Sequence, residues 1–251
     1  MDNLLYNETE LMLAKTVQDF AQDYLAPMAP ILDEREEFPM ENFHRLASMG
    51  LLGITIDEKY GGSGGGFKEF SIVTEEIAKA CGATSAIYGS HIGLVLQSIA
   101  RFGNEEQKSR FLPPLIDGTS VGAWGLTEPE SGSDLASLST RAVRDGDEFV
   151  INGGKVWTTM AHRADWIMLL TRTDPDAPKH RGISFVLVDM KSPGVTVRPI
   201  INMAGGHEFN QVTFDDVRVP RANVVGDEDR GWYVAVTLLD FERSGIDYSA
   251  A

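Results

Sequence analysis

The stretch WGLTEPESGSD at residues 124–134 decides how this sequence is interpreted. It follows the first apparent strand, and its small residues and hydroxyls let backbone amides face a ligand. About twenty residues later, KVWTT at 155–159 places Trp157 beside two threonine hydroxyls. A flat heteroaromatic cofactor with polar ring edges suits this pair of segments. Trp157 could equally be a core residue, and Thr158 and Thr159 are common in strands.

Before this stretch the sequence is helical. Asn7, with Glu10 three residues later, can cap a first amphipathic helix that Pro27 and Pro30 are expected to end. Further helices are predicted at 41–49, 67–80, 84–102 and 105–115.

After Val121 the pattern changes to short strands rich in Val, Ile, Phe and Trp. Asp145-Gly146 and Asn152-Gly153 are two-residue hairpin signals. Strand-like runs follow at 148–151, 166–171, 183–188, 195–201, 211–214 and 217–219. Their spacing predicts an antiparallel barrel or sandwich. Helical periodicity returns near Arg230, so the fold class is α+β, with domains at 1–120, 121–229 and 230–251.

Composition excludes several classes of protein. The chain has 251 residues and a formal net charge of -15, which disfavours nucleic-acid binding in the absence of a basic cluster. One cysteine rules out an internal disulfide. No apolar run is long enough to span a bilayer, and the acidic N-terminal segment does not resemble a targeting peptide. We expect a cytoplasmic protein.

Three other motifs fail on inspection. Residues 61–65 (GGSGG) match a nucleophile elbow formally but are better explained as a turn, and they lack the Lys-Ser/Thr of a phosphate-binding loop. His207-Glu208 lacks the second histidine of a zinc protease. The acidic run 227–229 has Gly231 and Leu238 where a calcium loop needs oxygen ligands. No metal site is expected.

The chain resembles the FAD-dependent acyl-CoA dehydrogenases. The resemblance rests on GLTEPESGSD at 125–134, INGGKVWTT at 151–159, GGHEFNQVTFDDVRVP at 205–220 and GDEDRGW at 226–232, with EKYGGSGG at 58–65 in the helical part. It implies an N-terminal helical domain, a middle β-barrel domain and the first helix of a C-terminal four-helix bundle, of which the sequence would hold only the start.

The resemblance also implies a flavin site. Thr127 matches the residue that contacts the pyrimidine side of the ring, Leu126 lies against the ring, and Ser133 lies between flavin and thioester. Trp157 would pack on the flavin, and Thr159 would donate to N5, where a donor stabilises developing charge. The other residues expected at the cofactor are Trp124, Gly132 and Thr158. Glu128 and Glu130 are expected to face solvent and to take no part in the chemistry.

The substrate residues are predicted on the last helix. Removing an α-proton from a thioester requires a carboxylate whose pKa a desolvated pocket raises. Glu242, directly before Arg243, matches one of the two places from which this family takes its base. Arg243 and Asp240 match the substrate-binding positions. On spacing alone, Glu242 could instead be an exposed glutamate, with Arg243 paired to Asp247.

The resemblance implies oxidation of an acyl-CoA to a 2-enoyl-CoA in fatty-acid β-oxidation, with electrons passing to an electron-transfer flavoprotein. A homo- or hetero-tetramer is expected. Two alternatives stay open: a flavin oxidase or monooxygenase of the same fold, and a non-catalytic fragment or partner subunit. The acyl chain length is not set by these motifs.

Overall fold

The computed structural model describes residues 5–243, with side chains described for residues 5–240. The chain divides into two compact units. The helical unit comprises Met1–Leu96, Leu112–Thr119 and Asp240–Ala251, and the β unit comprises Gln97–Phe111 and Ser120–Leu239. The domain limits expected at 120 and 229 stay predictions.

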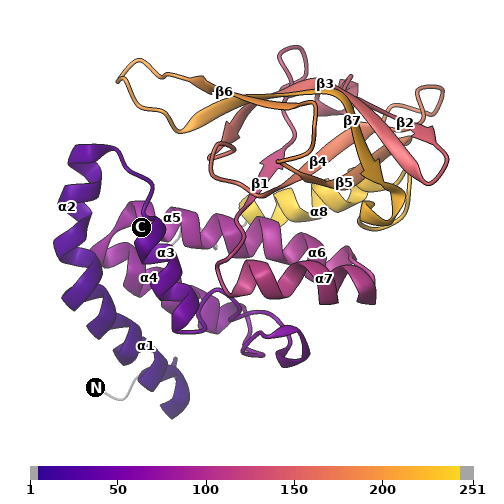
Figure 1. Cartoon of the computed structure of the whole chain (residues 1–251). Coiled ribbons are helices and arrows are strands. Elements are labelled where there is room, and N and C mark those ends of the chain that lie inside the picture. The colour runs from indigo at the N-terminus through magenta and orange to yellow at the C-terminus, as the bar shows by residue number, and fades with distance from the viewer. Residues whose placement is uncertain (1–4, 244–251) are drawn as a thin grey trace. The chain divides into compact units, whose positions relative to one another are not determined.

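Helices form close to the predicted ranges 41–49, 67–80, 84–102 and 105–115 (Figure 1), whereas those at 26–35 and 58–60 are not among the predicted ones. The capping box at Asn7 is confirmed: the Asn7 amide donates to Glu10 Oε2 at 2.7 Å, and the Glu10 amide donates to Asn7 Oδ1 at 2.9 Å. The helices are α1 (Glu8–Phe20), η1 (Ala21–Leu25), α2 (Ala26–Arg35), α3 (Met40–Ser48), η2 (Glu58–Tyr60), α4 (Phe67–Ala80), α5 (Gly82–Ser90), η3 (His91–Leu96), α6 (Gln97–Phe102) and α7 (Glu105–Ile116).

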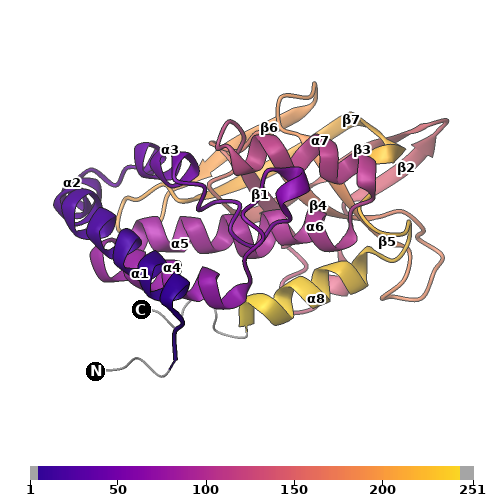
Figure 2. The ribbon, with the colours of Figure 1, turned by 90° about the horizontal axis from the view of Figure 1, so that it is seen from below.

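The prediction that Pro27 and Pro30 end the first helix is wrong. α1 continues through the π-helical turn η1 into α2, which ends at Arg35 (Figure 2). Pro27 lies in the first turn of α2, where the wider π turn has already displaced the hydrogen-bond ladder and the missing N–H costs little. Pro30 is tolerated in a helix that buries no side chain.

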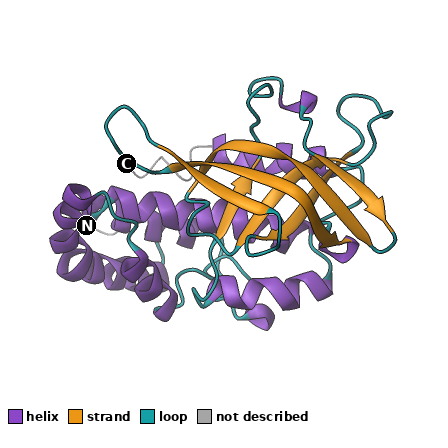
Figure 3. Cartoon of the chain, turned by 45° about the horizontal axis from the view of Figure 1, so that its top comes forward, coloured by secondary structure: helices purple, strands orange, loops and turns teal. Residues whose placement is uncertain are grey.

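The β unit is a curled seven-stranded sheet (Figure 3). Its strand order is β1-β4-β2-β3-β7-β6, and β5 pairs with β4. The strands are β1 (Gly122–Gly125), β2 (Arg141–Asp145), β3 (Glu148–Thr159), β4 (Trp166–Arg172), β5 (Ile183–Asp189), β6 (Val195–Ile200) and β7 (Phe209–Pro220).

The sheet is mixed, which corrects the predicted antiparallel barrel. β4 pairs in parallel with β1, and Arg172 pairs in parallel with Arg141 of β2, whereas the other pairings are antiparallel. The partner of β1 is not its neighbour in the chain, because the β2–β3 hairpin lies between them. Local turn signals report only sequential pairings, so they could not predict this one.

The signal at Asn152-Gly153 marks a β-bulge and not the predicted hairpin turn. β3 runs through it and continues to Thr159, with a register shift between Ile151 and Gly153 against β7. Gly153 has φ +145, and a Cβ there would lie 2.6 Å from the Thr140 Cα. The hairpin turn between β2 and β3 is Gly146-Asp147, one residue beyond the predicted pair.

The last described helix, α8 (Gly231–Arg243), begins against the sheet within the β unit. A Cβ on Gly231 would lie 2.4 Å from the Phe185 amide, so this helix begins directly against β5. The apolar core cluster of the unit comprises Ala123, Ala142, Phe149, Ile151, Ala161, Ile167, Leu169, Val186, Val188, Val212, Phe214, Val217 and Val219.

Candidate functional site

The two segments singled out in the sequence lie against each other in the β unit. The Val156 amide donates to the Thr127 carbonyl at 2.9 Å, and Lys155 Nζ donates to the Leu126 carbonyl at 3.0 Å. The strand bearing Trp157 is therefore fastened to the loop that follows β1. The expected flavin-facing residues come from these two segments.

A buried ion pair completes this junction. Lys155 Nζ lies 2.8 Å from Glu128 Oε1, and the two side chains are 0% and 3% exposed. Glu128 also accepts from the amides of Ser139 and Thr140, at 2.6 and 2.9 Å, and from the Ser139 hydroxyl at 2.8 Å. Such a pair is rigid because each oxygen of the carboxylate has defined donors.

The electrostatics of the pair favour the charged carboxylate. Burial alone would raise the pKa of Glu128, but the Lys155 ammonium and the donors at Ser139 and Thr140 outweigh it and hold the pKa at about 2. Burial in turn lowers the pKa of Lys155 to about 8, against the attraction of Glu128.

The expectation that Glu128 faces solvent is wrong, whereas Glu130 is exposed as expected. Glu128 is a structural residue that the sequence analysis missed. The available signal was Lys155, a charged residue that continues the alternation of the apolar Phe149 and Ile151 along β3. A lysine there requires a buried acid.

Trp157 is displayed on the surface and is not a core residue. Its side chain is 58% exposed, and its φ of +60 lies in the left-handed region, which is costly for a bulky side chain. The residue lies in a register shift between Lys155 and Thr158, and its ring meets Phe209 edge-to-face at 5.8 Å. The bulge turns the indole outward at a cost in backbone strain.

Unpartnered polar atoms lie in both segments. Among the described residues, the Trp124 indole Nε1 and the Thr158 hydroxyl are buried and have no hydrogen-bond partner. Trp124 packs at a steep angle on Phe185, with 6.1 Å between ring centroids. Each of these two atoms is left with an unused capacity to donate a hydrogen bond.

The remaining predicted cofactor residues are accessible. Thr159, Gly132 and Ser133 are exposed, and Leu126 and Thr127 are half-buried. An exposed aromatic ring, unpartnered donors and accessible hydroxyls on adjoining segments form a donor set that fits a flavin ring.

The predicted substrate residues lie at the end of α8. Asp240 is exposed. Glu242 and Arg243 belong to the last turn of the helix, but their side chains lie outside the described part of the chain. Their predicted roles, and the alternative pairing of Arg243 with Asp247, therefore stay predictions.

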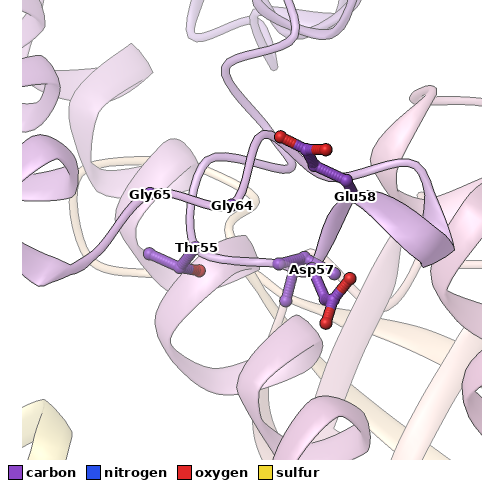
Figure 4. A pocket seen from close by; sticks show the side chains of 6 residues that line it. Thr55, Asp57, Glu58, Gly64 and Gly65 are labelled. Carbon is purple, nitrogen blue, oxygen red and sulfur yellow. The ribbon is translucent and has the colours of Figure 1, made fainter.

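The glycine-rich turn in the helical unit has a structural explanation. A Cβ on Gly62 would lie 2.0 Å from the Ile56 carbonyl oxygen, and the Ser63 hydroxyl donates to the Gly50 carbonyl at 3.1 Å. Beside this turn is a shallow, open depression of about 380 Å³, lined by Thr55, Ile56, Asp57, Glu58, Gly64 and Gly65 (Figure 4). Its two acidic side chains point to different sides, so they do not form a catalytic pair.

The described residues offer neither a metal-binding cluster nor a membrane-spanning helix. Between residues 5 and 240, no group of three or more His, Cys, Asp or Glu side chains is arranged to hold a metal ion. No helix within the described range is both long enough and apolar enough to cross a membrane.

A helical unit followed by a curled mixed sheet is the arrangement of the acyl-CoA dehydrogenase fold. The family model for the N-terminal domain of acyl-CoA dehydrogenases matches residues 7–119, and the model for the middle domain matches residues 123–217. This chain belongs to the acyl-CoA dehydrogenase family, which confirms the resemblance drawn from its motifs.

Individual relatives agree with the family models. Acyl-CoA dehydrogenase FadE29 of Mycobacterium tuberculosis is 43% identical over 219 residues, which cover 84% of this chain and 56% of the relative. The mitochondrial isovaleryl-CoA dehydrogenase of Pongo abelii is 38% identical over 242 residues, 94% of this chain and 57% of the relative. These curated relatives are thus considerably longer than the chain.

A solved structure shares the fold. The crystal structure of acyl-CoA dehydrogenase from Geobacillus kaustophilus superposes with a TM-score of 0.90 at 32% identity, covering 98% of this chain and 66% of that one. Members of the family generally use FAD.

Proposed function

We propose that the protein binds FAD with the flavin ring against segments 124–134 and 157–159, and that it oxidises the α–β carbon bond of an acyl-CoA to give a 2-enoyl-CoA. The observation that supports this most directly is Trp157. In this protein the Trp157 indole is exposed although its backbone lies in the strained left-handed region. It adjoins a loop that the buried Lys155–Glu128 ion pair holds in place.

Each residue of the two segments has a distinct task. The Trp157 indole provides an apolar face on which a flat ring can stack. The hydroxyls of Thr127 and Thr159 donate to polar ring edges, and Thr158 and Trp124 offer the donors that lack partners. Bound FAD would supply the hydride acceptor. Leu126 packs against the ring, and Gly132 leaves room beside it.

The substrate residues act on the thioester. Glu242 removes the α-proton, and exclusion of water around its carboxylate would raise its pKa toward that of a working base. Arg243 is placed to meet the anionic coenzyme A, with Asp240 one turn earlier, and Ser133 lies between cofactor and thioester. These assignments rest on the match to the family motifs.

The proposal extends to the protein's setting. Electrons leave to an electron-transfer flavoprotein, the substrate comes from fatty-acid breakdown, and the protein works as a tetramer in the cytoplasm. These assignments rest on family membership. The acyl group is left open.

A matched pair of variants tests the base. Glu242→Gln is expected to abolish the bleaching of bound flavin by acyl-CoA under anaerobic conditions, while Glu34→Gln, which changes an exposed glutamate of α2, leaves bleaching intact. Bleaching of Glu242→Gln at the wild-type rate would show that another residue takes the proton.

The identity of the electron acceptor distinguishes a dehydrogenase from an oxidase. A dehydrogenase reduces a dye or flavoprotein acceptor and releases little peroxide from oxygen. Peroxide release matching acyl-CoA consumption would identify an oxidase instead. Protein that stays colourless after incubation with FAD would support a non-catalytic subunit.

A further inference from the structure

Two histidines and an asparagine form a compact cluster where β3 ends and β7 begins. His162 and His207 stack with 4.2 Å between ring centroids. Asn210 is fully buried and hydrogen-bonds to both rings. Its Nδ2 lies 3.2 Å from His162 Nδ1, and its Oδ1 lies 2.9 Å from His207 Nε2. The assigned flavin-facing residues do not include these three.

The hydrogen bonds determine which ring nitrogens carry protons. Asn210 Nδ2 also donates to the Thr158 carbonyl at 3.1 Å, and a carbonyl can only accept, so the amide orientation is fixed. Oδ1 must then accept from a protonated His207 Nε2. His162 Nδ1 must accept from Nδ2, which requires a neutral His162 with its proton on Nε2.

The cluster is connected directly to the segment that faces the cofactor. Thr158 pairs with Asn210, and Thr159 with Phe209, in the β3–β7 register. The Trp157 ring rests on Phe209. Asn210 therefore hydrogen-bonds to the backbone at Thr158, which lies between the Trp157 indole and the Thr159 hydroxyl.

We propose that Asn210, oriented by His162 and His207, is the positioning residue for segment 157–159, and that it holds this segment only while His162 is uncharged, so that flavin binding weakens in acid. The proposal rests on the proposed flavin site.

The surroundings of His162 support the uncharged state. Burial, then the charges of His207 and Arg163, lower the pKa of His162. On the β7 side, the Glu208 carboxylate is held by Asn202 Nδ2 at 3.3 Å. Protonation of His162 Nδ1 would place two donors face to face and pull Asn210 away from the Thr158 carbonyl. A protonated His207 would keep its Nε2–H bond to Asn210.

The positioning can be measured without flavin. The chain is labelled with 5-fluorotryptophan, and the Trp157 fluorine signal is assigned by its loss in Trp157→Phe. We expect this signal to shift as the pH falls from about 8 through the lowered pKa of His162, in parallel with the imidazole ¹⁵N signals of His162. His162→Asn, which keeps an acceptor near the Nδ1 position but cannot titrate there, should remove the shift.

Two control variants make the test specific. His207→Gln keeps a donor near the Nε2 position and should retain the shift. His44→Gln changes an exposed histidine of the helical unit and should also retain it. A Trp157 signal that does not follow His162, or a ¹⁵N spectrum showing a proton on His162 Nδ1 at neutral pH, would overturn the proposal.

The second readout is FAD affinity, followed by quenching of flavin fluorescence. Losing one such hydrogen bond predicts that the dissociation constant in wild type rises by up to about tenfold as the pH falls through the lowered pKa of His162, and stays level in His162→Asn. An equal rise in both proteins would overturn the coupling. Absence of FAD binding at every pH would contradict the proposed function, and the fluorine measurement would still decide the positioning.

Discussion

At the residue scale, the ligand-binding role that we propose for Trp157 comes at the expense of local backbone stability. Replacing it with glycine relieves the left-handed backbone at φ +60, worth about 1 kcal/mol, and removes its contact with Phe209. We expect these effects nearly to cancel in the free energy of unfolding, measured with denaturant, while FAD affinity falls about tenfold through lost stacking. Trp157→Phe should keep most of the affinity. Strong destabilisation by Trp157→Gly would mean that the indole is a packing residue.

Lys155, by contrast, is a buried residue that stabilises the fold. Lys155→Met leaves the buried Glu128 carboxylate without its cation, and the expected loss of stability is about 3–5 kcal/mol. The matched control is Lys179→Met, which breaks the exposed pair with Asp134 and should change stability little. Equal effects of the two substitutions in chemical denaturation would contradict the buried-pair account.

His91 makes the stability of the helical unit depend on pH. Its Nε2 lies 2.8 Å from the Leu115 carbonyl, and burial lowers its pKa to about 4. The unfolded chain binds this proton near pH 6.5, so stability is intact above that value and is lost as pH falls toward 4, by about 3 kcal/mol. His91→Gln, which keeps a donor, should flatten the curve of unfolding free energy against pH, whereas His44→Gln should not. Parallel curves for all three proteins would contradict the assignment.

At the element scale, β3 decides the form of the site. Its bulge at Gly153 precedes the Lys155–Trp157 segment, and a Cβ at Gly153 would clash with Thr140. Gly153→Ala is therefore expected to cost about 3 kcal/mol. Gly154→Ala is the control, since its Cβ would make ordinary contacts of 3.5 and 3.6 Å. Thermal unfolding compares the two, and equal midpoints would rule out the steric explanation.

The elements also show what the sequence could predict. The α4 helix begins at Phe67 and ends at Ala80, as the apolar spacing indicates, because its amphipathic period and the adjoining glycine are local signals. The parallel β1–β4 pairing and the continuity of β7 through Asp215 and Asp216 depend on contacts distant in sequence. Propensity and turn patterns therefore did not reveal them.

The residues of the candidate site also fall into those with a local sequence signal and those that depend on contacts distant in sequence. The motifs containing Thr127 and Trp157 were recognisable in the sequence because their residue types suit a flavin. Glu128 was misjudged because its partner lies 27 residues away, and Asn210 was not singled out because its role arises only when β7 pairs with β3. Side-chain hydrogen bonds between strands carry no local sequence period.

At the scale of the whole molecule, the formal net charge of -15 offers no general attraction for an anionic coenzyme A. Under the proposed function, a few placed groups such as Arg243 would have to recognise coenzyme A. We expect Arg243→Gln to raise the Michaelis constant for acyl-CoA more than it lowers the turnover number, as for a residue that binds the ground state. Steady-state kinetics with a dye acceptor measures both; a loss confined to the turnover number would assign Arg243 to the chemical step.

The central claim is that segments 124–134 and 157–159 together hold the flavin ring. The most direct measurement is the visible flavin absorbance retained after incubation with FAD and removal of unbound cofactor. It should be made on wild type and on the double variant Trp157→Ala, Thr159→Val. We predict one flavin retained per chain in wild type and a large loss in the double variant, with both proteins folded by circular dichroism. Equal retention by the two proteins would contradict the claim.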